Sequence, residues 1–315
     1  MKKVFLTGAS GFIGRQCVSL LAAKGLEVHA VSSRSPVQIV PDIRWHRVDL
    51  LDSRQAKAIV AKIKPDSLLH FAWYTAPGKY WTCPENLRWV EASLSLLREF
   101  HRVGGARVVM AGSCAEYEWK DEECCEETTA LAPTSVYGAA KNTLQSLLGS
   151  FGHQSGMSSA WGRIFHLYGP HEPPSRLVSS VIRSLLRGEP ALCSDGRQVL
   201  DFLHVADVAS AFVALLESNV EGPVNIASGV PVTVRRVVET IAQKIARPDL
   251  VRFGARPATP GPSRLVACVR RLVREVGWKP HYALDTGLDQ TIQWWRDCDA
   301  MRAAAIDREE SVRIG

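Results

Sequence analysis

The first half of the chain alternates between short, nearly continuous apolar runs and longer segments whose apolar residues recur at helical spacing. The short runs predict strands at residues 3–7, 28–31, 45–48, 67–71, 107–111 and 158–164. The longer segments predict helices at residues 12–23, 53–63, 84–103 and 135–151. Strands that alternate with helices across short connections are typical of a parallel sheet with both faces covered. The pattern therefore predicts an α/β fold.

Beyond residue 168 the pattern loosens and prolines become frequent. A further strand is predicted at 199–205 and a helix at 206–218, which would return the chain to the main sheet. We therefore expect an α/β domain, a smaller and mainly helical domain, and a charged, mobile tail. The expected boundaries are 1–168 rejoined by about 199–228 for the first, 169–198 and 229–300 for the second, and 301–315 for the tail.

Composition excludes several classes of protein. Of 315 residues, 46% are hydrophobic, and the net charge of +6 includes no dense Lys/Arg run that would indicate nucleic-acid binding. No apolar segment approaches the ~20 residues of a membrane span. The 8 cysteines form no Cys-x-x-Cys pair and no zinc-spaced set, which favours a reducing compartment. We predict a cytoplasmic protein without a metal, a membrane segment or a nucleic-acid partner.

A glycine-rich turn follows the first predicted strand and opens the first predicted helix. Glycines let backbone N–H groups approach a pyrophosphate, whose charge a helix N-terminus favours. The alternative is a turn whose glycines only permit close packing. At the first strand–helix junction of an α/β chain, the turn predicts dinucleotide binding by a Rossmann-type, doubly wound parallel sheet. The predicted cofactor contacts here are Gly8, Ser10, Gly11, Phe12, Ile13 and Gly14.

Further motifs follow in a fixed order. They are Asp49-Leu50, His70-Phe71-Ala72, Tyr137 with Lys141, Tyr168-Gly169-Pro170, and the segments 201–207 and 277–280. With the glycine turn, over residues 1–298, they resemble the extended short-chain dehydrogenase/reductase superfamily, in its nucleotide-sugar epimerase, dehydratase and reductase branch. The resemblance implies NAD(P) on the larger domain, a nucleotide sugar on the smaller one, and a homodimer through the helices at 84–103 and 135–151. It also implies cofactor contacts at Asp49, Leu50, Phe71 and Ala72.

Tyr137 and Lys141 lie four residues apart, on one face of a predicted helix. A cation beside the phenol favours the phenolate and should bring the tyrosine pKa from ~10 toward neutrality. The tyrosine could then exchange a proton with a carbinol while hydride moves, and both residues would contact the cofactor. In related enzymes a serine or threonine ends the preceding strand, which implies that Ser113 holds the substrate oxygen. A serine that only shapes a strand-end turn is the alternative.

Two neighbouring features bear on the substrate. Cys114 follows Ser113, where sugar 4,6-dehydratases of the family begin an Asp-Glu pair, so dehydration is not expected. We interpret Cys114 as a small packing residue at the substrate, with an acid or base role as the alternative. The aromatic run after residue 71 is interpreted as a substrate wall, or alternatively as a plug between the domains. Its predicted substrate contacts are Trp73, Tyr74, Thr75 and Tyr80, with Trp73 also beside the nicotinamide.

The second half departs from the family pattern at two contact positions. His166 stands where the family has an Asn that contacts substrate, and Leu200 where an Arg often meets the diphosphate. Arg197 or Arg264 is expected to supply that charge. His166 and His171 have no carboxylate or cysteine partner at a spacing that suits a metal.

The end of the second predicted strand bears on the choice of cofactor. An acid is common there, where it accepts hydrogen bonds from both ribose hydroxyls and would repel a 2′-phosphate. This chain has Ser32, Ser33 and Arg34 instead, which offer donors and a permanent cation. NADP(H) is therefore favoured over NAD(H), with Ser33 and Arg34 as contacts.

The cofactor in turn bears on the reaction. Reductases of the family consume NADPH, whereas its epimerases usually retain NAD. The leading hypothesis is therefore a nucleotide-sugar 4-ketoreductase acting on a nucleoside-diphosphate 4-keto-6-deoxyhexose. A nucleotide-sugar 4-epimerase with retained NAD is the alternative. A non-catalytic dinucleotide sensor is disfavoured, because the chain keeps both Tyr137 and Lys141.

Overall fold

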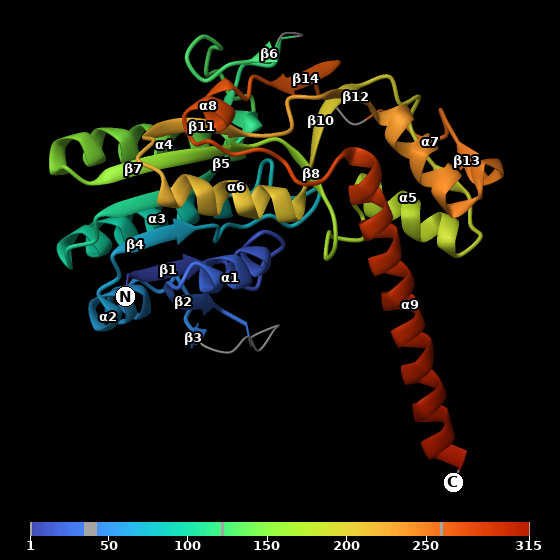
Figure 1. The fold of residues 1–315 in the computed structure, drawn as a ribbon, viewed down its shortest axis with the longest axis horizontal. Coiled ribbons are helices and arrows are strands. Elements are labelled where there is room, and N and C mark those ends of the chain that lie inside the picture. Colours follow the sequence, from blue (N-terminus) through green and yellow to red (C-terminus); the bar gives the residue numbers. More distant parts are fainter. Residues whose placement is uncertain (1, 35–42, 121–122, 259–260, 315) are drawn as a thin grey trace.

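The computed structural model describes residues 2–34, 43–120, 123–258 and 261–314. Seven parallel strands form the main sheet, in the order β11-β7-β5-β4-β1-β2-β3 (Figure 1). They are β1 (Lys3–Thr7), β2 (Glu27–Ser32), β3 (Arg44–Arg47), β4 (Ser67–His70), β5 (Arg107–Ser113), β7 (Ser158–Ile164) and β11 (Gly222–Ile226). From β1 the chain first adds β2 and β3 on one side of the sheet. It then crosses to the other side of β1 and adds β4, β5, β7 and finally β11. The predicted doubly wound α/β fold is confirmed.

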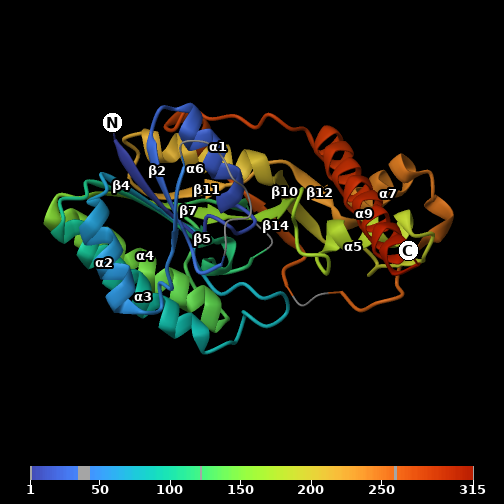
Figure 2. The same ribbon diagram turned by 90° about the horizontal axis from the view of Figure 1, so that it is seen from below.

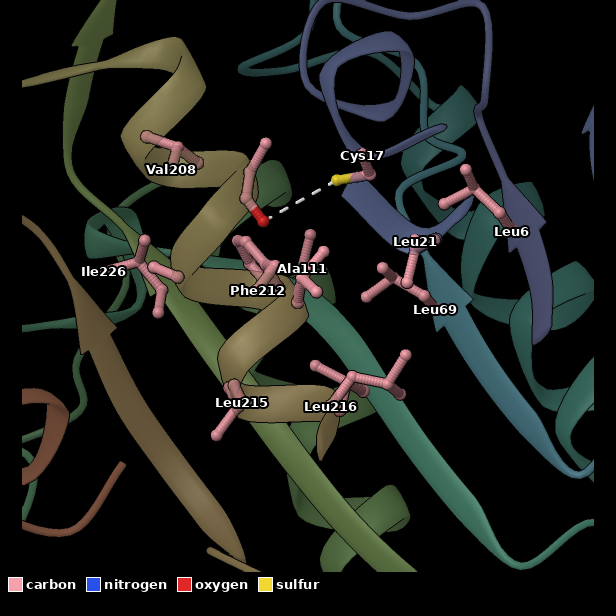
Figure 3. Close-up of a cluster of buried hydrophobic side chains, with 14 of the residues drawn as sticks. Leu6, Cys17, Leu21, Leu69, Ala111, Val208, Phe212, Leu215, Leu216 and Ile226 are labelled. Carbon is pink, nitrogen blue, oxygen red and sulfur yellow. Dashed lines mark hydrogen bonds between the residues drawn. The ribbon is translucent and has the colours of Figure 1, made fainter. Parts of the chain in front are cut away.

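Helices cover both faces of this sheet (Figure 2). On one face lie α1 (Gly14–Ala23) and α6 (Val205–Glu217), and on the other lie α2 (Ser53–Ile63), α3 (Glu85–Arg102) and α4 (Val136–Ser155). Successive side chains of β1 point to opposite faces of the sheet and so enter both cores. Leu6 packs under α1 and α6, whereas Phe5 packs under α2 and α3. Figure 3 shows Phe212 and Leu216 of α6 beside Leu21 of α1 in the first of these cores. Burial on both faces explains why the strands appear in sequence as continuous apolar runs.

A second, smaller sheet has the order β12-β10-β14-β6, with β8 paired to β10. Its strands are β6 (Glu123–Cys124), β8 (His166–Tyr168), β10 (Val199–His204), β12 (Pro231–Thr233) and β14 (Arg264–Ala267). Three helices gather beside it (Figure 1): α5 (Leu177–Leu186), α7 (Val234–Ile245) and α9 (Leu284–Ile314). The remaining elements are the strand pair β9 (Ala191–Leu192) and β13 (Val251–Arg252), the helix α8 (Arg270–Arg274), and 3-10 turns at Cys114–Glu116 and Pro248–Leu250.

The return of the chain to the main sheet differs in detail from the expectation. The strand expected at 199–205 forms as β10 but pairs within the second sheet, whereas α6 and β11 rejoin the first. Residues 301–314, expected as a tail, continue helix α9. The proposed domain boundaries stay a prediction. Within the described ranges, no helix is both long and apolar enough to cross a membrane.

Candidate active site

The strand order reverses between β1 and β4, and doubly wound sheets bind dinucleotides outside the carboxyl ends of strands at such a point. The two strand ends are tied together, because the Thr7 hydroxyl accepts the N–H groups of Phe71 and Ala72, each at 3.2 Å. His70 Nδ1 lies 2.8 Å from the same hydroxyl, and burial lowers the pKa of His70 to about 3. A neutral, packed histidine therefore helps to fix the floor of the crevice.

A cavity of about 690 Å³ opens at this crevice. Every predicted cofactor contact lines it: Gly8, Ser10, Gly11, Phe12, Ile13, Gly14, Ser33, Arg34, Asp49, Leu50, Phe71, Ala72, Trp73, Tyr137 and Lys141. So do Ser113 and four further predicted substrate contacts: Thr75, Tyr80, Cys114 and His166. The structure thus brings together residues from the ends of β1, β2, β4 and β5 and from the start of α4.

Three predicted substrate contacts, Tyr74, Arg197 and Arg264, are not among the residues that line the cavity. The Arg197 side chain is 88% exposed on the turn before β10, where it pairs with Asp195 at 3.4 Å. Arg264 begins β14 in the second sheet. Arg197 is close to Leu200 in the sequence, and Arg264 is close to it in the second sheet. Neither side chain lines the cavity.

The glycine turn forms a cradle that only glycine permits. Gly8 has a φ of +65°, and a Cβ on it would come within 2.9 Å of the Ala72 backbone nitrogen. A Cβ on Gly14 would overlap the Gly8 carbonyl oxygen. The turn is closed by a hydrogen bond from the Gly11 N–H to the Gly8 oxygen at 2.8 Å. This close approach of backbone at the start of α1 fits the pyrophosphate of a dinucleotide.

Replacing Gly14 with Ala should weaken NADPH binding at least ~10-fold, equivalent to ~1.4 kcal/mol, because the new methyl group forces the cradle open. Fluorescence titration with NADPH measures the change. Gly149→Ala on α4 is the matched control, since the nearest atom to its added Cβ is Gln145 Nε2 at 3.9 Å. A Gly14→Ala variant that binds NADPH as tightly as the Gly149→Ala variant would contradict the assignment.

The end of β2 lies against this cradle. Ser32 Oγ is 2.7 Å from Ser10 Oγ and accepts the Arg34 N–H at 3.0 Å, so its hydrogen-bonding capacity is taken up locally. Ser33 and Arg34 are exposed at the cavity. Within the described part of the chain, no carboxylate pairs with Arg34, and Asp49 is the only acidic residue lining the cavity. The lining is thus set up for an anionic ligand.

Ser113, Tyr137 and Lys141 meet beside this cavity. Helix α4 begins after Ser135, whose hydroxyl accepts the Gly138 N–H at 3.1 Å, and its first turns carry Tyr137 and Lys141 against β5. The Tyr137 hydroxyl hydrogen-bonds the Ser113 side chain. Lys141 Nζ donates to the Ala111 carbonyl at 2.8 Å and lies 3.6 Å from the centre of the Trp73 ring.

Burial dominates the protonation of this group. It raises the pKa of Tyr137 above its usual range, with the Ser113 hydrogen bond opposing, and it lowers the pKa of Lys141 to about 7. The expectation that Lys141 brings the Tyr137 pKa toward neutrality is therefore wrong for this structure, because desolvation of the phenolate is the largest influence on that pKa and raises it. Tyr137 carries its proton at neutral pH. Burial also raises the pKa of the Cys114 thiol to about 12, so Cys114 supplies no thiolate there.

A buried ion pair positions Ser113. Glu116 and Arg163 are 0% and 1% exposed and meet at 2.7 Å. The Glu116 carboxylate also accepts the Ser113 N–H at 2.7 Å and the Trp161 indole N–H at 2.9 Å. These contacts fix the end of β5 where its serine faces Tyr137. Sequence analysis missed the pair, because its members come from different strand–loop units.

The side chain of Asn86 holds the aromatic run after β4 in place through hydrogen bonds. Asn86 is 0% exposed, accepts the Trp73 indole N–H at 2.8 Å and donates to the Tyr80 and Cys83 carbonyls at 2.7 and 2.9 Å. Tyr80 then meets the Tyr137 ring edge-on at 4.8 Å. The aromatic run after β4 thus lines the cavity through Trp73, Tyr80 and Trp81.

The lining includes residues that sequence analysis missed, among them Phe165 and Arg176. Arg176 lies at the N-cap of α5 and forms no ion pair with any carboxylate in the described ranges. Its position in a proline-rich stretch before a helix gave no sequence signal that it would line the cavity. Only the folding of that stretch over the crevice reveals it as a cation available to ligand.

A doubly wound parallel sheet with a glycine cradle and an adjoining Ser/Tyr/Lys group defines an NAD(P)-dependent enzyme of the oxidoreductase type. Residues 4–227 match the model of the NAD dependent epimerase/dehydratase family. The chain belongs to that family, and its resemblance to the extended short-chain dehydrogenase/reductases is confirmed.

Curated relatives cover several activities. A UDP-glucuronic acid decarboxylase 1 of Xenopus tropicalis is 25% identical, over 94% of this chain and 72% of the relative. A UDP-glucose 4-epimerase of Rhizobium meliloti (strain 1021) is 26% identical, over 92% and 96%. A dTDP-4-dehydro-6-deoxyglucose reductase of Escherichia coli is 22% identical, over 92% and 96%.

Solved structures agree in fold over almost the whole chain. MoeE5 in complex with UDP-glucuronic acid and NAD is 31% identical with a TM-score of 0.84, covering 95% of this chain and 100% of that one. The UDP-glucose 4-epimerase of Thermus thermophilus in complex with NAD is 26% identical with a TM-score of 0.83, covering 93% and 99%.

Proposed function

We propose that this enzyme uses NADPH to reduce the keto group of a nucleoside-diphosphate 4-keto-6-deoxyhexose. The observation that carries the proposal is the end of β2, where Ser33 and Arg34 are exposed at the cavity and, among the residues that the structure describes, no carboxylate pairs with Arg34. A guanidinium and a hydroxyl suit the 2′-phosphate of NADP, which an acid would repel. NADPH is the reagent of a net reduction.

Bound at the glycine cradle, NADPH would supply the hydride. The residues of the chain would do the rest: Ser113 holds the carbonyl oxygen and Tyr137 gives its phenolic proton to that oxygen as the alcohol forms. Because burial raises the Tyr137 pKa, the residue enters the reaction protonated, as a reduction requires. Lys141 would contact the nicotinamide ribose. Arg176 would meet the substrate diphosphate, the role expected of Arg197 or Arg264.

Replacing Arg34 with Ala should weaken NADPH binding ~10- to 100-fold while leaving NADH binding nearly unchanged. The reason is the loss of a charge-assisted hydrogen bond to the 2′-phosphate, worth ~1.5–3 kcal/mol. Titration of both cofactors measures the ratio of their dissociation constants. Arg54→Ala, which removes an exposed arginine on α2 away from the cavity, should keep the wild-type ratio. An unchanged ratio in the Arg34→Ala variant would show that Arg34 does not determine the preference for NADPH over NADH.

The reaction itself is tested on protein purified without added cofactor. The protein is denatured, any released nucleotide is identified, and NADPH absorbance is then followed with dTDP-4-keto-6-deoxyglucose and its GDP and CDP counterparts. Stoichiometric consumption of NADPH by protein that arrives without nucleotide supports the reductase. Tightly bound NAD with no net consumption would overturn it.

A nucleotide-sugar 4-epimerase is the second candidate, and two of the comparisons support it. The relative from Rhizobium meliloti is named a UDP-glucose 4-epimerase, and the Thermus thermophilus epimerase was solved with NAD. An epimerase would use Ser113, Tyr137 and Lys141 in both directions and keep its cofactor. Conversion of UDP-glucose to UDP-galactose without added NADPH would support this candidate.

A homodimer through α3 and α4 is also proposed. The two helices pack together, and Leu87 and Leu147 on them are 64% and 44% exposed. Replacing Leu147 with Glu should shift the mass in light scattering from twice 34.6 kDa to one chain, because a carboxylate would be buried at the interface. Leu192→Glu on β9, also at a 44% exposed leucine, should leave the dimer intact. A wild-type protein that is monomeric at micromolar concentration would contradict the proposal.

A further inference from the structure

Two cysteines far apart in the sequence are neighbours on the second sheet. Strands β6 and β14 pair in parallel, with Glu123 opposite Val266 and Cys124 opposite Ala267. The hydrogen bond from the Cys268 N–H to the Cys124 oxygen, at 2.9 Å, continues this ladder by one residue. Cys125 and Cys268 therefore follow the strands side by side, and their sulfur atoms lie within 4.8 Å of each other.

Strand alternation decides which side chains face outward. Cys124 and Ala267 are 1% and 0% exposed, and both pack into the core beneath the sheet. Residues on either side of them must face the opposite way. Glu123 is accordingly exposed, and Cys125 and Cys268 are half-buried, all on the outer face.

These three side chains form a ligand set. One ligand atom from each, the two sulfurs and a carboxylate oxygen, lies within 4.8 Å of the others. Around a tetrahedral zinc ion, with bonds of ~2.0–2.3 Å, such atoms lie about 3.5–4 Å apart, so small side-chain rotations close the site. We propose that Glu123, Cys125 and Cys268 bind a thiophilic divalent metal ion, Zn²⁺, with water as a fourth ligand.

The backbone beneath the set is already ordered. Asn225, 0% exposed, donates through Nδ2 to the Cys124 and Cys268 carbonyls at 2.8 and 3.1 Å. The Cys125 N–H donates to the Thr129 hydroxyl at 2.8 Å. Metal binding then needs no ordering of a loop, which is the largest cost of forming a site from flexible ligands.

The ion pairs that the structure describes around these three side chains do not involve the Glu123 carboxylate, which is therefore available to a metal ion. The neighbouring Glu127 is paired with Arg270 at 2.6 Å, whereas Glu123 has no cationic partner among the residues that the structure describes. Two thiols beside an unpaired carboxylate match the preference of Zn²⁺ for sulfur with nitrogen or oxygen. The sequence alone showed no such set, because Cys125 and Cys268 belong to different motifs and meet only through the pairing of β6 with β14.

The site has a structural role. The segment between Ser113 and Tyr137 reaches the second sheet through β6, and the metal would fasten that segment to β14. None of the three ligands lines the active-site cavity, so occupancy should raise the unfolding temperature and leave turnover nearly unchanged. The site is independent of the reaction proposed above.

The test uses the full-length protein, freshly reduced and freed of metal. Titration with Co²⁺ should give thiolate-to-cobalt absorption at one equivalent, lost on adding Zn²⁺, and Zn²⁺ should raise the unfolding temperature. The variants Cys125→Ser and Cys268→Ser should each lose the absorption and the temperature rise, and Glu123→Gln should weaken Co²⁺ binding ~10-fold. Cys83→Ser, which replaces another half-buried thiol, should behave as wild type.

Two outcomes would overturn the proposal. One is absorption that is absent in the wild type, or that persists in both Cys125→Ser and Cys268→Ser. The other is a Cys125–Cys268 disulfide in protein purified without reductant, detected as two of the eight thiols unreactive and a mass lower by two hydrogens. That result would assign the pair to redox chemistry.

Discussion

Replacing Tyr137 with Phe should lower the rate of reduction ~10²- to 10⁴-fold, the usual contribution of a positioned proton donor. The half-buried phenol keeps its proton at neutral pH beside Ser113, so its removal takes away the proton donor proposed for the carbonyl oxygen. The thiol of Cys114 is no substitute, because burial raises its pKa to about 12. Single-turnover decay of NADPH absorbance measures the loss directly.

Binding measurements separate this effect from misfolding. The Tyr137→Phe variant should bind NADPH within about twofold of the wild type, because the glycine cradle is untouched. Tyr282→Phe removes a hydroxyl outside the cavity and should keep full activity. A Tyr137→Phe enzyme with more than about a tenth of the wild-type rate would show that another group donates the proton.

Replacing Glu116 with Ala should cost ~3–5 kcal/mol of stability, because it leaves the Arg163 guanidinium charged and buried without its partner. For a domain of this size the loss lowers the unfolding temperature by on the order of 10 °C. Calorimetry or denaturant unfolding measures it. Turnover should also fall, since the Ser113 N–H loses its acceptor and the serine its fixed position.

Two controls test whether the buried pair is the cause. Glu85→Ala breaks a surface pair with Arg88, whose side chain is 59% exposed, and should change stability by at most ~1 kcal/mol. The double variant Glu116→Ala with Arg163→Met should be less destabilised than Glu116→Ala alone, because no buried charge remains. Equal losses for the Glu116 and Glu85 variants would reject the explanation.

The sequence by itself determined the alternating strands and helices of the main sheet and the glycine turn at the end of β1. Strands buried on both faces must be apolar along their whole length, and a cradle that excludes a Cβ must be glycine, so β1 and the turn Gly8–Gly14 were predictable from local pattern. The shared orientation of Tyr137 and Lys141 was also predictable, because residues four apart in a helix lie on the same face.

Only the tertiary structure decided what depends on contacts between distant segments. Burial of Tyr137 and Lys141 reverses the direction expected for the tyrosine pKa, and burial is a property of the packed site. Arg176 reaches the cavity whereas Arg197 does not, because the path of the chain before β10 turns Arg197 to solvent. The pair Glu116–Arg163 and the set of Glu123, Cys125 and Cys268 likewise arise from strand pairing. Local periodicity carries no information on such pairings, because each joins residues from separate elements.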